Sequence, residues 1–137
     1  MPVKELCCNG TFLFLVMAIS SLYFVVSGLQ YWITPYLTTV FDLPQKEVFV
    51  FYAVTCLTAP LIGVLVSICV FNKIGGGYKS RRAFCMCLAF GSMAVVAAFP
   101  VPFVNSAYTT FALLWLIFFF GAMILPPLVG MMLSTVP

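Results

Sequence analysis

Side chains that could carry out acid–base, nucleophilic or metal chemistry are scarce in this chain. It has no histidine, and its three carboxylates, Glu5, Asp42 and Glu47, all lie outside the long apolar blocks of the sequence. A serine or cysteine nucleophile inside those blocks would therefore have no carboxylate or imidazole base beside it. We expect no enzyme activity, no metal site and no cofactor.

The six cysteines do not form a metal-binding pattern either. Zinc sites use cysteines at C-x-x-C type spacings, often with histidine, and this sequence has neither. We expect free thiols. For the adjacent Cys7 and Cys8, before the first apolar block, palmitoylation is the alternative, because cysteines next to a membrane span are typical acceptors.

Polar residues inside the first apolar block follow a helical period. Ser20, Tyr23, Ser27, Gln30 and Thr34 recur at i, i+3, i+7, i+10 and i+14, which places them on one narrow stripe of a helix. Hydroxyl and amide groups in a membrane need partners. The polar stripe therefore predicts either hydrogen bonds between helices or the lining of a water-filled cavity.

Small residues and prolines mark the other blocks. Ala59, Gly63 and Ser67 repeat every four residues, which predicts a face on which two helices approach closely. Prolines interrupt three of the four blocks, at Pro35, at Pro60 and at the pair 126–127. We expect kinks there, a feature common in transporters but also found in other membrane helices.

The elements that hold these residues are four apolar blocks, approximately 11–37, 48–71, 83–102 and 108–136, after an N-terminal tail of residues 1–10. Each approaches or exceeds the roughly 20 apolar residues that cross a bilayer as a helix. The chain is 64% hydrophobic and 7% charged, whereas a soluble domain carries about 25% charged residues. We predict an all-α, polytopic transmembrane bundle of four spans with membrane lipids around it and no nucleic-acid partner. The first block is too long for a typical signal peptide, and Glu5 offsets Lys4.

Charge in the loops predicts the orientation of the chain. Residues 72–82 contain four basic residues and no acid, whereas the loop around Asp42 is net negative. Because short loops rich in lysine and arginine stay in the cytoplasm, we expect residues 72–82 and both termini to be cytoplasmic, with the Asp42 loop and residues 103–107 on the other side. Tyr31, Trp32 and Tyr36 are then expected near the outer membrane interface.

The sequence around the basic loop resembles a known family. The run from Gly63 to Arg82 resembles the cytoplasmic loop signature of the major facilitator superfamily. In that signature glycine, an acid, glycine and a basic run link two helices. The matching loop residues here are Gly75, Gly76, Lys79, Arg81 and Arg82. Asn72 stands where the aspartate is usual, so a charge-relay role does not carry over to this position. The segments 28–36 and 55–64, followed by this loop, look like helices seven and eight of a spinster-type facilitator. The remaining two blocks would be helices nine and ten.

This resemblance implies a partial major facilitator fold and a fragment of a secondary-active transporter for a small organic or lipid-like solute. Tyr23, Ser27, Gln30 and Tyr31 would contribute to the substrate cavity, and the remaining helices of the same transporter would be the chief partner. The resemblance also implies a plasma or endolysosomal membrane. The last apolar block runs directly to Pro137, which is expected of a partial product. The alternative is a self-contained four-span scaffold or partner-binding protein.

Overall fold

The fold consists of four long helices, as the length of the apolar blocks predicts. The computed structural model describes residues 10–74 and 81–135, and these ranges contain no strand. The elements are α2 (Gly10–Phe41), α3 (Gln45–Ile74), α4 (Arg81–Ala98), the short 3₁₀ helix η1 (Val101–Phe103) and α5 (Ala107–Thr135). Taking α4 together with η1, all four segments are long and apolar enough to cross a membrane. The chain thus has the helices of a multi-pass membrane protein, and the predicted all-α, four-span bundle is confirmed.

Helix ends differ from the predicted bounds by at most four residues, and local chemistry explains the largest differences. The first helix runs to Phe41 instead of residue 37, with Pro35 inside it, and stops at Asp42, whose φ of 49° lies in the left-handed region. In the third span the α-helix ends at Ala98, because Pro100 has no N–H to continue the hydrogen bonds of the helix and disfavours helical backbone in Phe99. The chain forms η1 there.

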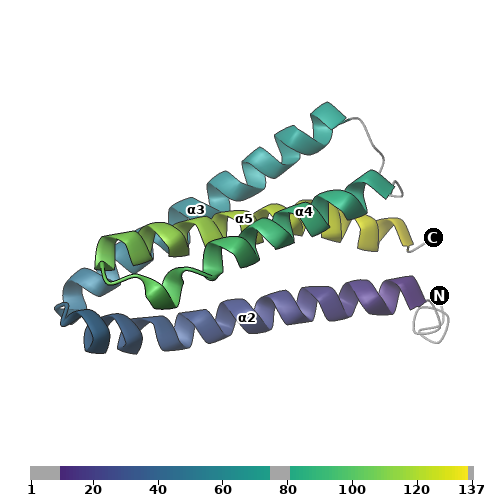
Figure 1. The fold of residues 1–137 in the computed structure, drawn as a ribbon. Helices are drawn as coiled ribbons and strands as arrows, with labels where there is room; N and C mark the ends of the chain where they lie inside the picture. The colour runs from purple at the N-terminus through teal and green to yellow at the C-terminus, as the bar shows by residue number, and fades with distance from the viewer. Residues whose placement is uncertain (1–9, 75–80, 136–137) are drawn as a thin grey trace.

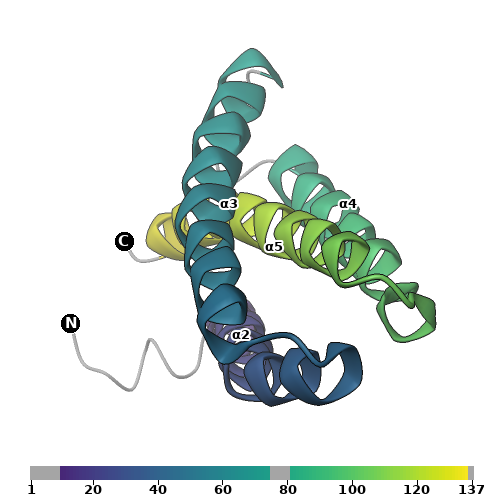
Figure 2. The ribbon, with the colours of Figure 1, turned by 90° about the vertical axis from the view of Figure 1, so that its left-hand side faces the viewer.

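Helix α5 lies at the centre of the bundle and packs against each of the other three long helices. Figures 1 and 2 show α3 crossing α5 on one side, α4 alongside α5 on the other, and α2 beneath them. In the most apolar stretch of α5, 33% of residues are buried inside the bundle, whereas in that of α2 none is. Helix α2 is therefore the most open of the four.

Two apolar clusters hold the bundle together at its opposite ends. One joins Ile33 and Leu37 of α2 to Phe111 and Leu114 of α5, with Val48 of α3. The other joins Ala83 at the start of α4 to Leu128 and Met131 near the end of α5. Leu15 and Ile19, from the first half of α2, pack against this cluster. These pairings make α2 and α4 antiparallel to α5.

The direction of the helices alternates along the chain, as consecutive membrane spans require. One end of the bundle contains the start of α2, the end of α3, the start of α4 and the end of α5 (Figure 1). The α2–α3 and α4–α5 connections lie at the opposite end. We call these the 74–81 end and the 42–45 end. Which end faces the cytoplasm stays a prediction from charge.

Candidate functional site

Helices α3 and α5 approach each other closely at Gly63 of α3. A Cβ atom built on Gly63 would lie 2.5 Å from the carbonyl oxygen of Phe119 and 3.2 Å from the Cβ of Ala122, both on α5. Ala59 and Ser67, one turn to either side, are fully buried. The predicted small-residue packing face of the second span is therefore confirmed, and its partner is α5.

A buried hydrogen bond joins the same two helices one turn further along. The hydroxyl of Ser67 donates to the carbonyl oxygen of Met123 at 2.6 Å. In a regular helix that carbonyl would accept from the N–H of residue 127, but Pro127 has none. Ser67 thus supplies from α3 the donor that the proline removes from α5.

A second polar contact between α3 and α5 lies nearer the 42–45 end. The indole Nε1 of Trp115 donates to the hydroxyl oxygen of Thr58 at 3.0 Å, and the Thr58 hydroxyl donates in turn to the Val54 carbonyl at 2.8 Å. Sequence reasoning missed this pair. The available signal was that a tryptophan deep in an apolar helix needs a partner for its N–H.

The predicted polar stripe of the first span lies on the open side of α2. Ser20, Tyr23, Ser27 and Gln30 are all exposed in the four-helix bundle, whereas Ile33 and Leu37 of the same helix are buried. Thr34 is half-buried. The structure therefore brings the candidate cavity residues together on one helix face, but no described helix covers them.

Tyr31, the fourth candidate cavity residue, is also exposed, and its ring makes an edge-to-face contact with Trp32 at a centroid distance of 5.2 Å. Helix α2 continues for ten residues beyond Tyr31, to Phe41. At about 1.5 Å per residue the pair lies roughly 15 Å before the end of the helix. Helix α2 is therefore exposed both along the polar stripe and on the side that carries Trp32.

Part of the predicted cytoplasmic loop motif falls outside the described residues. Its residues Gly75, Gly76 and Lys79 lie outside the described ranges. Cys7 and Cys8 of the N-terminal tail, the candidates for palmitoylation, also lie outside them. Arg81 and Arg82 open α4 and are exposed, and Nη1 of Arg82 donates to the carbonyl oxygen of Ile74 at 3.3 Å. The arginine therefore ties the start of α4 to the last carbonyl of α3.

Residues 10–74 and 81–135 contain no cluster of three or more histidine, cysteine, aspartate or glutamate side chains that could hold a metal ion. The four cysteines in these ranges are free thiols; Cys56 and Cys87 are half-buried, and Cys69 and Cys85 are exposed.

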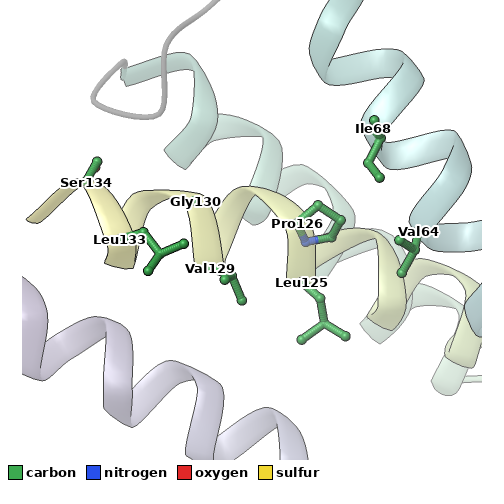
Figure 3. A pocket seen from close by; sticks show the side chains of 8 residues that line it. All are labelled: Val64, Ile68, Leu125, Pro126, Val129, Gly130, Leu133 and Ser134. Atoms are coloured by element: carbon green, nitrogen blue, oxygen red, sulfur yellow. The ribbon is translucent and has the colours of Figure 1, made fainter. Parts of the chain in front are cut away.

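An apolar groove of about 690 Å³ opens between α3 and α5 toward the 74–81 end. Figure 3 shows its two walls, Val64 and Ile68 on α3 and a row of α5 side chains that includes Leu125, Val129 and Leu133. The groove exists because the two helices touch at Gly63 and Ser67 and then diverge (Figure 1). No pattern in the sequence predicts it, since it depends on the crossing of two helices that are apolar on every side.

Comparison with protein-family models, with curated proteins and with solved structures finds no match to this chain.

Proposed function

We propose that this chain forms part of a secondary-active membrane transporter of the major facilitator type, which moves a small organic or lipid-like solute. The observation that carries the proposal is the exposed polar stripe of α2, formed by Ser20, Tyr23, Ser27 and Gln30. In hydrocarbon, an unpaired hydroxyl or amide costs several kcal/mol, so such a face needs protein or water against it.

The four-helix arrangement agrees with this need. Helix α2 packs apolar residues, among them Ile33 and Leu37, against α5, whereas the polar stripe on the neighbouring side of the same helix stays exposed. A bundle complete in lipid would be expected to cover these polar side chains as well. Further helices of the same transporter, placed on the open side of α2, would enclose a path in which the polar stripe contacts the solute. The resemblance of the loop and of segments 28–36 and 55–64 to a spinster-type facilitator implies such helices.

Thiol accessibility in the native membrane tests the path. Ser27→Cys lies on the polar stripe, and Val25→Cys lies at nearly the same depth on α2 but off the stripe, and both positions are exposed in the bundle. With the native cysteines changed to serine, a small charged thiol reagent is expected to label Cys at 27 at least tenfold faster than Cys at 25. Equal, slow labelling at both positions would contradict a water-filled path along this face.

The apparent mass of the endogenous polypeptide separates a transporter from a small scaffold. An antibody against the sequence 72–82 is expected to detect a band of roughly 50 kDa, the size of about twelve spans. A band near the 15.1 kDa of this chain would favour the alternative, a self-contained four-span scaffold or partner-binding protein.

A further inference from the structure

The groove between α3 and α5 is lined almost entirely by apolar side chains and is open along one side. Its walls are aliphatic, and Gly130 and the flat ring of Pro126 leave room between them. It is open at the side, so in a membrane it faces the acyl region of the bilayer.

An empty groove of this size would be unfavourable in a membrane. Side chains that line a void lose their dispersion contacts on one side, and a dry apolar gap excludes water. Leu65, an exposed side chain next to the lining residue Val64, is also apolar. A lipid chain is the abundant apolar occupant at this depth.

The charges at the end of the bundle toward which the groove runs point to the type of lipid. The groove runs toward the 74–81 end, where Lys73, Arg81 and Arg82 are the charged residues among those that the structure describes. The described acids, Asp42 and Glu47, lie at the 42–45 end. Basic side chains at a membrane surface favour anionic headgroups.

We propose that the groove holds an acyl chain of an anionic phospholipid whose headgroup lies at the basic 74–81 end. The lipid fills the wedge between α3 and α5 and supports their crossing at Gly63 and Ser67 from the open side. This site is separate from the polar stripe on α2, and the proposal holds whether or not the chain belongs to a transporter.

Native mass spectrometry of the purified full chain tests the proposal, with phosphatidylglycerol and phosphatidylcholine of identical acyl chains as probes. The wild-type chain is expected to retain one phosphatidylglycerol, with a preference over phosphatidylcholine of about fivefold or more. Changing Lys73, Arg81 and Arg82 to glutamine is expected to remove the preference and to leave acyl binding in place. Equal retention of both lipids by the wild-type chain would overturn the proposal.

Two variants test the groove itself. Gly130→Leu fills it from α5, and Val129→Phe narrows it from an exposed position that the fold tolerates more easily. Each is expected to lower lipid retention at least fivefold, whereas Val96→Phe, on the exposed face of α4, is expected to leave it unchanged. Retention at the wild-type level by a folded Val129→Phe chain, with helicity checked by circular dichroism, would show that lipid binds elsewhere and refute the site.

Discussion

The hydroxyl of Ser67 on α3 donates to the carbonyl oxygen of Met123 on α5 at a distance of 2.6 Å, and it replaces the backbone donor that Pro127 lacks. Ser67 is fully buried, and so is Pro127. The break that proline makes in the hydrogen bonds of α5 is thus repaired by a neighbouring helix. A proline in a membrane helix is tolerated when the freed carbonyl finds such a partner.

Removing the Ser67 hydroxyl should weaken the pairing of α3 with α5. Ser67→Ala leaves the Met123 carbonyl buried without a donor, and we expect it to lower the free energy of unfolding in detergent by about 0.5–2 kcal/mol. The measurement is a denaturation curve of the purified chain in mixed micelles. Ser92→Ala is the control, because the Ser92 hydroxyl is exposed and bonds only the Leu88 carbonyl of its own helix.

A double-mutant cycle with Pro127→Ala tests whether the Ser67 hydroxyl stabilises the chain by replacing the N–H that Pro127 lacks. Alanine at 127 restores a backbone N–H for the Met123 carbonyl, so Ser67→Ala should cost close to nothing in that background. An unchanged cost would mean that the hydroxyl acts through packing and not by replacing the missing donor.

Adding one methyl group at Gly63 should separate the two helices. The new Cβ would overlap the Phe119 carbonyl, a backbone atom that cannot rotate away, so Gly63→Ala should destabilise the chain by about 1–3 kcal/mol. Gly121→Ala is the matched control, since nothing lies within 4 Å of a Cβ at that glycine. Comparable thermal stability of the two variants in detergent would argue against close packing at Gly63.

Length and spacing predicted the helices and one packing face correctly. Four apolar blocks gave four helices, and the four-residue repeat of Ala59, Gly63 and Ser67 marked the face that meets α5, because close approach needs small side chains wherever the partner lies. The third predicted span, 83–102, lies within the apolar segment Arg81–Phe103, in which α4 ends at Ala98 and the chain continues as η1.

The partners of these faces could not be predicted. Which helix lies opposite Gly63, or opposite Thr58, depends on the order of packing among four mainly apolar helices, and lipid gives little contrast between an inner and an outer apolar face. The polar stripe was recognised from its period, but its position on the open side of α2 needed the fold. The groove between α3 and α5 needed both the crossing and the divergence of the two helices.

The Trp115–Thr58 hydrogen bond should contribute measurably to the same helix pair. Thr58→Val keeps the side-chain volume but removes the acceptor, and we expect a loss of about 0.5–1.5 kcal/mol in unfolding free energy. The loss should shrink in a Trp115→Phe background, where no indole N–H remains. Thr39→Val serves as control, because that exposed hydroxyl bonds carbonyls of its own helix. A cost that is the same in both backgrounds would contradict the pairing.

Neutralising the basic loop should disturb the orientation of the whole chain. Lys73, Lys79, Arg81 and Arg82 hold the 74–81 end in the cytoplasm if the positive-inside rule sets the topology, so changing all four to glutamine should let a substantial fraction of chains insert the other way round. The reporter is Gln45→Cys, exposed at the start of α3 and at the opposite end of the bundle, in a chain whose native cysteines are replaced by serine. A membrane-impermeant maleimide applied to intact cells is expected to label this cysteine in the parent chain and to label it less than half as much in the four-glutamine variant.

Lys46→Gln, which removes a positive charge from the 42–45 end, is the matched control and should leave labelling unchanged. Full labelling of the four-glutamine variant would mean that the spans themselves set the orientation. For chains at the cell surface, labelling of the parent only after the cells are made permeable would reverse the predicted topology.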